Sequence, residues 1–192
     1  PWMLRLETKE TGVGRYDQRR AWIMDTLLER SEKAGLYWQL SLFDHGSFSQ
    51  SHDAAWKDNP YNEDLGGMCR LPTEFATKPT ARQYSQRLLR YMVNRWGYSP
   101  HLVMWDLFNE IDISDIQPAD ARQWITQTSQ FLRSIDPNRR PITVSFHHES
   151  PEEVWSLPTI DVIQLHLYER RDFAELFCGP MIDELRQTYQ KP

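Results

Sequence analysis

The sequence predicts an α/β fold of the (β/α)8 TIM-barrel type, present as a partial barrel of about four parallel strands with their helices. Segments with helical periodicity alternate with short apolar segments along the chain, the pattern of right-handed βαβ units and a parallel sheet. Each apolar segment has one apolar face and one face that becomes polar toward its carboxyl end. Because an open sheet covered by helices on both sides favours apolar residues on both faces, a barrel whose interior opens into a site explains this asymmetry better.

The first two helices are predicted from end signals and spacing. Residues 17–34 begin at Asp17, a good N-cap, and stop before Gly35, which tolerates the left-handed backbone at a helix end. Residues 79–96 form the second helix, with Thr77 as its expected cap.

The remaining helices follow the same periodicity. Residues 118–135 have the clearest helical period, and Asp136-Pro137-Asn138 breaks it. Residues 151–156 are expected to form a short helical turn. A final helical stretch covers much of 172–189, with a predicted interruption near Gly179-Pro180, since proline lacks an amide hydrogen and disrupts helix interiors.

Four strands are predicted between these helices, at 36–43, 102–108, 142–146 and 162–168. Their side chains alternate between two faces, as in any strand. The longest irregular connection runs over 46–78 and contains Gly, Asp, Asn and Pro. A connection of this length in a compact domain is more often functional than not.

Composition narrows the class of protein. The chain has 192 residues, enough for a single domain with a substantial core. Its 22 basic and 27 acidic residues give a net charge of −5, which argues against nucleic acid or a membrane surface as a partner. Two cysteines are too few for a disulfide framework or a zinc cluster. Because Pro1-Trp2-Met3 is not a natural start, the compartment cannot be read from the N-terminus.

The carboxyl ends of the predicted strands carry polar residues, and this is where barrel and open-sheet enzymes place their chemistry. Asn109-Glu110 follows the apolar run 102–108 directly. A carboxyl group at this place, beside an amide that can orient a hydroxyl, suits general acid/base catalysis on a polyhydroxylated substrate. The other three strands end in Asp44-His45, His147-His148-Glu149 and His166-Leu167-Tyr168.

These strand ends belong to a longer set of motifs that covers nearly the whole chain. The set consists of Tyr16-Asp17, Arg19-Arg20-Ala21-Trp22, Glu32-Lys33-Ala34-Gly35-Leu36-Tyr37, Asp44-His45-Gly46, Arg95-Trp96-Gly97-Tyr98-Ser99-Pro100, Trp105-Asp106-Leu107-Phe108-Asn109-Glu110 and His166-Leu167-Tyr168. With these motifs the chain resembles the cellulase-like retaining glycoside hydrolases with (β/α)8 barrels, close to glycoside hydrolase family 5.

The resemblance implies hydrolysis of O-glycosidic bonds in β-linked oligosaccharides or polysaccharides by a retaining double displacement. In that reaction Glu110 would be the acid/base that protonates the leaving oxygen and later activates water. Asn109 would bind the sugar 2-hydroxyl, and His45 would line the sugar subsite. His166 would support the acid/base region, and Tyr168 would orient the nucleophile. No metal and no cofactor are implied.

Trp56 and Tyr61 lie in the long connection 46–78. Aromatic rings of this kind can act as platforms for the apolar faces of sugar rings, so both are candidate substrate-binding residues. No family motif fixes them, and local packing of the connection is an equal explanation.

A retaining hydrolase needs a second carboxylate about 5–5.5 Å from the acid/base. By the resemblance this nucleophile follows strand seven, and we expect it beyond the C-terminus. Residues 1–192 would then be one partial catalytic domain that holds strands three to six and lacks strands one, two, seven and eight. We expect such a chain to be inactive alone and able to self-associate through unpaired barrel edges. Glu149 and Glu169 are the in-chain carboxylates that could substitute for this nucleophile, although neither matches a position of the family.

Other classes of function stay open from the residues alone. A metal-dependent hydrolase would use His147, His148 and Glu149, although adjacent side chains on a strand point apart. An aldolase would need a lysine at a strand end, and no predicted strand ends in one. A non-catalytic carbohydrate-binding half-barrel would keep the sugar contacts without the nucleophile.

Overall fold

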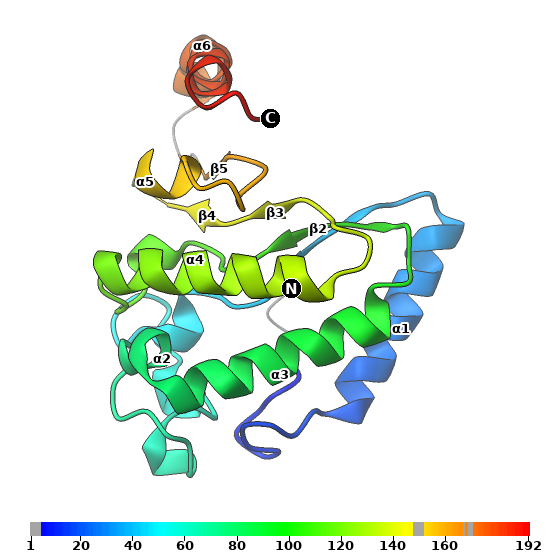
Figure 1. Ribbon diagram of the computed structural model, residues 1–192, viewed down its shortest axis with the longest axis vertical. Coiled ribbons are helices and arrows are strands. Elements are labelled where there is room, and N and C mark those ends of the chain that lie inside the picture. Colours follow the sequence, from blue (N-terminus) through cyan, green and yellow to red (C-terminus); the bar gives the residue numbers. More distant parts are fainter. Residues whose placement is uncertain (1–4, 148–151, 167, 169–170) are drawn as a thin grey trace.

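The computed structural model of the chain describes residues 5–147, 152–166, 168 and 171–192. Helices α1, α3 and α4 lie along one side of the strands, and α6 lies at the opposite end of the molecule, beyond α5 (Figure 1). Among the described residues, none of the helices combines the length and the apolar character required to span a bilayer.

All strand pairs are parallel. Strand β1 (Trp38–Ser41) pairs with β2 (Leu102–Asp106), which pairs with β3 (Ile142–Thr143), and β4 (Ser145–Phe146) pairs with β5 (Gln164–Leu165). Parallel strands separated by helices confirm the predicted α/β partial barrel.

The strands are shorter than predicted, and the segment 142–146 forms two strands rather than one. Its first half pairs with β2 and its second half with β5, because the chain passes from one neighbour to the other at Val144. Backbone contacts continue past the regular ladder, since the Leu107 amide donates to the Thr143 carbonyl at 2.9 Å. Each apolar segment of the sequence is therefore longer than the regular strand that it forms.

The predicted helices largely match the structure. Helix α1 covers Gln18–Lys33, and the Asp17 side chain accepts bonds from two amides of its first turn. Helix α3 covers Pro79–Trp96, but the predicted cap at Thr77 is wrong. Thr77 is instead the last residue of the short helix α2 (Glu74–Thr77), so its backbone is already helical.

Helix α4 (Pro118–Ile135) and the short helix α5 (Glu152–Trp155) lie where the sequence places them. Helix α6 spans Arg171–Tyr189 without a break, so the predicted interruption near Gly179-Pro180 is wrong. A proline removes one helical hydrogen bond, and a helix can continue when the turns on both sides hold their own bonds.

The connection 46–78 is more ordered than the sequence indicates. Besides α2 it contains three short 3-10 helices, at Gly46–Phe48, Trp56–Asp58 and Glu63–Leu65. Amide side chains brace them, because Asn59 Nδ2 donates to the Ser47 carbonyl at 2.7 Å. This segment therefore forms a folded layer at the carboxyl ends of β1 and β2.

Aromatic rings of that layer pack against rings of α4 and of the segment after β2. Phe48 and Phe75 have ring centroids 4.2 Å apart, and Trp124 of α4 lies 5.6 Å from Phe75 and 5.8 Å from Phe108. Phe108 is fully buried and directly precedes Asn109-Glu110. The packed rings thus fix the backbone from which the candidate acid/base projects.

Candidate active site

Glu110 lies just beyond the carboxyl end of β2, and only 4% of its surface is exposed. Its backbone has φ 54° and ψ 54°, a left-handed conformation that is rare for a residue with a side chain. The Glu110 amide donates to Ser145 Oγ at 3.1 Å. The neighbouring Asn109 is fixed by a parallel bridge to Asp44, with the Asn109 amide 2.9 Å from the Phe43 carbonyl.

Three predicted site residues converge on the Glu110 carboxyl group. His166 Nδ1 lies 2.6 Å from Glu110 Oε1, and the Tyr168 hydroxyl donates to the same oxygen. His45 Nδ1 lies 3.3 Å from the other oxygen, Oε2. His45 follows β1, Glu110 follows β2, and the other two follow β5, so the site draws on three separate strand ends.

These contacts set the protonation state of the site. Burial raises the pKa of Glu110, but hydrogen bonds from Tyr168 and His166 and the nearby imidazoles lower it more, so the pKa lies below the ordinary value. The hydrogen bond to Glu110 together with burial raises the pKa of Tyr168 to about 12. In this chain the carboxylate is therefore ionised and the phenol neutral near pH 7.

Two glutamines that the sequence reasoning did not single out extend this network. Gln164 Nε2 lies 3.1 Å from His166 Nε2, and Gln39 Nε2 donates to Gln164 Oε1 at 2.7 Å. Since an amide nitrogen is a donor, His166 Nε2 accepts and its Nδ1 carries the hydrogen that reaches Glu110. The signal was present in the strand alternation, because Gln39 shares a face with His45, and Gln164 shares one with His166.

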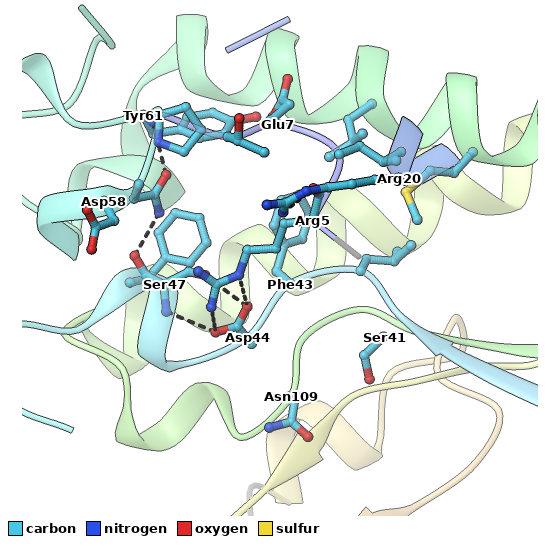
Figure 2. Close-up of a pocket in the computed structure, with 18 of the residues that line it drawn as sticks. Arg5, Glu7, Arg20, Ser41, Phe43, Asp44, Ser47, Asp58, Tyr61 and Asn109 are labelled. Atoms are coloured by element: carbon cyan, nitrogen blue, oxygen red, sulfur yellow. Dashed lines mark hydrogen bonds and ion pairs between the residues drawn. The ribbon is translucent and has the colours of Figure 1, made fainter. Parts of the chain in front are cut away.

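A cavity of about 430 Å³ lies beside this site and is bordered by Asn109 and Asp44, though not by Glu110. Asp44 is not free to bind a ligand, because Arg5 pairs with both of its oxygens at 2.7 and 3.0 Å. Figure 2 shows Arg5 reaching Asp44 next to Ser47, with Asn109 at the same end of the cavity. Asn109 is thus the predicted substrate contact that remains accessible there.

Trp56 and Tyr61, the predicted sugar platforms, are both buried in this structure, although Tyr61 borders the cavity, and their role as substrate contacts stays a prediction. Their exposed fractions are 5% and 2%, and both rings lie near Phe48, with centroid distances of 6.3 and 6.2 Å. A sugar can stack only on an accessible ring face. Periodicity gives no information about burial in an irregular segment, so the sequence could not separate platform from core.

The third predicted strand end, 147–149, is described only at His147, which borders the site. His147 stacks on Tyr168, with ring centroids 4.6 Å apart, and its amide donates to Asp112 at 2.8 Å. His148, Glu149 and Glu169 lie outside the described residues. Within the described part of the chain, no group of three or more His, Cys, Asp or Glu side chains could hold a metal.

The parallel α/β architecture, with side chains gathered at Glu110 beyond the strand ends, defines the class as a partial barrel with a candidate acid/base site. No protein-family profile matches the chain. The chain is 26% identical over 167 residues to a probable mannan endo-1,4-beta-mannosidase F of Neosartorya fischeri, a match to 83% of this chain and 32% of that protein. It is 24% identical over 196 residues to a putative mannan endo-1,4-beta-mannosidase P of Arabidopsis thaliana, and this match covers 88% of this chain and 46% of that protein.

A solved structure shows the same fold. The endo-beta-1,4-mannanase of Thermotoga petrophila superposes with a TM-score of 0.64 at 16% identity, over 88% of this chain and 43% of that one. These relatives confirm the predicted resemblance to barrel-type glycoside hydrolases. The chain spans about a third of the length of the first fungal relatives and under half of the plant ones.

Proposed function

We propose that this chain carries the acid/base side of a retaining glycoside hydrolase active site, with Glu110 as the acid/base. The observation that carries the proposal is the convergence of His45, His166 and Tyr168 on the buried Glu110 carboxyl group. A carboxyl group held by donors at the end of a barrel strand has the orientation that general acid/base catalysis needs.

In the proposed reaction, the Glu110 carboxyl group protonates the glycosidic oxygen as the bond to the sugar breaks. A second carboxylate, which we place outside this chain, attacks the anomeric carbon and forms the glycosyl-enzyme. Glu110 then removes a proton from water, which displaces that carboxylate and regenerates both groups. Asn109, which borders the cavity, would bind the sugar 2-hydroxyl next to the reacting bond.

The lowered pKa of Glu110 is consistent with a second carboxylate that completes the site. An acid that protonates a leaving group near neutral pH needs a raised pKa, whereas the donors around Glu110 lower it here. A second carboxylate close by would raise the pKa of Glu110, since two like charges cannot both be ionised cheaply. The residues of this chain thus hold the Glu110 carboxyl group in place, and the second carboxylate would keep that group protonated.

We propose β-1,4-linked mannan as the substrate, because the fungal and plant relatives and the solved structure are all named as mannanases acting on this linkage. The choice between mannan and other polysaccharides depends on contacts from loops, some of which we place outside this chain. Soluble β-linked glucans are therefore the comparison substrates.

The test uses the longest natural protein that contains this chain, assayed on soluble β-mannan, soluble β-glucan and aryl β-mannosides. Glu110→Gln should lower kcat on mannan by about 10² to 10⁴. The variant should retain rapid glycosyl-enzyme formation from an aryl mannoside with a strongly acidic phenol, because that leaving group needs no proton. Added azide should then restore turnover by replacing the activated water.

Glu63→Gln is the matched control, since Glu63 is exposed and lies in the connection 46–78. It should leave all three activities unchanged. Mannan turnover by Glu110→Gln at the wild-type rate would disprove the assigned role, and binding of mannan without turnover by the wild-type protein would favour a carbohydrate-binding function. The 192-residue chain alone should show no turnover.

A further inference from the structure

The backbone amides after β2 change direction just before Glu110. The Leu107 amide donates to the Thr143 carbonyl of β3 at 2.9 Å, whereas the Asn109 amide donates to the Phe43 carbonyl, on the β1 side, at 2.9 Å. In a regular strand the amides point alternately to the two neighbouring strands, so residues 107 and 109 would face the same one. An extra residue is therefore accommodated between them, as in a β-bulge, a feature that is frequent next to active sites.

The carbonyl groups show the same irregularity. The Asp106 carbonyl accepts from the Leu42 amide at 2.9 Å, and the Asn109 carbonyl accepts from the His45 amide at 3.1 Å. These two carbonyls are three residues apart and face the same neighbour, whereas a regular strand repeats every two residues. The irregularity turns the Glu110 amide away from β1 and toward β4.

On the β4 side, the Glu110 amide meets a side chain rather than a backbone carbonyl. It donates to Ser145 Oγ at 3.1 Å. Ser145 Oγ donates to the Phe108 carbonyl at 3.4 Å, and the Ser145 amide donates to the same carbonyl at 3.2 Å. Ser145 is fully buried and Glu110 is 4% exposed, so these bonds are shielded from bulk water. Ser145 thus joins the carbonyl before Asn109 to the amide after it.

The position of the Glu110 carboxyl group depends on this backbone. Its φ of 54° lies in a region that side chains disfavour, so the conformation has to be held by its surroundings. Without the Ser145 hydroxyl, the buried Glu110 amide would lose this acceptor, which destabilises the observed conformation. A displacement of the carboxyl group by about 1 Å is enough to weaken catalysis, and it would lengthen the 2.6 Å contact with His166 Nδ1.

We propose that Ser145 is a positioning residue for the acid/base, whose hydroxyl holds the Glu110 backbone in the left-handed conformation that brings the carboxyl group to His166 and Tyr168. This inference rests on the proposed function of Glu110. Ser145 acts only through Glu110: the proton passes between the Glu110 carboxyl group and the glycosidic oxygen or water, and the serine neither gains nor loses one.

Carbon-13 NMR of the glutamate carboxyl groups tests the proposal in the 192-residue protein without requiring turnover. In the wild type, hydrogen bonds from Tyr168 and His166 help to hold the pKa of Glu110 below its ordinary value. In Ser145→Ala the carboxyl group should lose part of these contacts while it stays buried, so its pKa should rise.

Matched variants separate this effect from a general loss of packing. Ser129 of α4 is equally buried, and its Oγ lies 2.7 Å from Thr159 Oγ, so Ser129→Ala removes a comparable hydroxyl and should leave the Glu110 titration unchanged. Ser145→Thr and Ser145→Val have nearly the same shape and differ in the hydroxyl group. The threonine variant should titrate like the wild type and the valine variant like Ser145→Ala, and this pair gives the comparison if the alanine variant does not fold.

Kinetics of the longer natural protein give a second readout. Ser145→Ala should lower kcat on mannan about tenfold with KM unchanged, the effect of one hydrogen bond. Glycosyl-enzyme formation from an aryl mannoside with a strongly acidic phenol should stay near the wild-type rate, because that leaving group needs no proton. In a Glu110→Gln background, Ser145→Ala should lower mannan turnover no further, since the two residues act as a unit.

An unchanged Glu110 titration in both Ser145→Ala and Ser145→Val would overturn the proposal. An equal loss of rate on mannan and on the activated aryl mannoside would also overturn it, because that is the effect of a purely structural residue. Failure of the proposed function is distinguishable, since it would appear as absent mannan turnover in the wild type while the Ser145 variants still change the Glu110 titration.

Discussion

At the scale of single residues, Glu110 combines a strained backbone with a buried charge. Its φ of 54° places the side chain beside His45, His166 and Tyr168. A left-handed residue with a Cβ costs about 1–2 kcal/mol, and such costs concentrate at functional sites. The sequence shows which residue is there but not this backbone angle, because local propensity favours the right-handed region.

Substitutions at Glu110 should reveal this strain. Glycine adopts a positive φ without a steric cost, whereas alanine does not. We expect Glu110→Gly to be more stable than Glu110→Ala by up to about 1 kcal/mol, despite the larger entropy of glycine in the unfolded chain. Urea unfolding of the two variants measures the difference, and a more stable alanine variant would show that the backbone is unstrained.

Glu7 is a second buried carboxyl group, at the wall of the cavity (Figure 2). Burial raises its pKa to about 7, although the Gly14 amide, 2.6 Å away, and Tyr61 act in the opposite direction. The folded protein binds this proton more tightly than the unfolded chain, whose pKa is 4.5. Its contribution to stability is therefore complete below pH 4.5 and is lost as the pH rises to about 7.

Glu7→Gln should remove this pH dependence. A shift of this size corresponds to up to about 3 kcal/mol, so the variant should be more stable than the wild type at pH 8 and similar at pH 4. Denaturant unfolding across this range measures the difference, and Glu10→Gln, at an exposed site of the same segment, is the control. Parallel pH profiles for Glu7→Gln and wild type would contradict the prediction.

The predicted site residues that the structure brings together share one physical basis. His45, Glu110, His166 and Tyr168 all lie at or just beyond the carboxyl ends of predicted strands, and parallel strands bring their carboxyl ends to one edge. The site roles assigned to them remain predictions. Gln39 and Asp53 were missed for different reasons. Gln39 lies within a strand, whereas Asp53, whose Oδ2 lies 3.1 Å from His45 Nε2, reaches the site only through the folding of a loop.

At the scale of elements, end signals predicted helices better than strands. Asp17 caps α1 as expected, because a cap is a local interaction. Strand limits depend on neighbours that are far away in sequence, so β3 and β4 could not be separated from one apolar run. Buried hydrogen bonds between elements could not be predicted from the sequence either, and those of Arg140 are the clearest example.

Arg140 joins the ends of three elements at the amino side of the sheet. Its guanidinium donates to the carbonyls of Gly97 and Ser99 at 2.7 and 2.8 Å and to Asp136 at 2.9 Å. Arg140→Met would leave the buried Asp136 carboxylate without its cationic partner, although Trp105 Nε1 and two backbone amides would still donate to it. It would also remove a donor from each of the two carbonyls, so we expect a loss of about 3–5 kcal/mol. Arg139→Met, at an exposed site, should cost little. Thermal unfolding measures the stability of both variants. Equal losses of stability would show that the Arg140 contacts do not stabilise the fold.

At the scale of the whole molecule, the two described sheets have outer strands with a single neighbour. Strand β1 pairs only with β2, and β5 pairs only with β4, although the Ile163 amide next to β5 donates to the Pro192 carbonyl at 3.0 Å. Unpaired edges of a parallel sheet expose amide and carbonyl groups that another chain can pair with. The cavity lies along β1 and is lined by Leu40, Met24 and Leu88, so apolar surface accompanies this open edge.

These edges predict self-association of the 192-residue chain. Light scattering after size-exclusion chromatography, at two concentrations that differ by about a hundredfold, should show a larger mass at the higher one, as mass action requires. A longer natural protein whose additional strands cover β1 and β5 should remain monomeric at both. If the 192-residue chain is also monomeric at both concentrations and unfolds cooperatively, its edges are protected by twist and side chains alone, and pairing with further strands would not be needed for its stability.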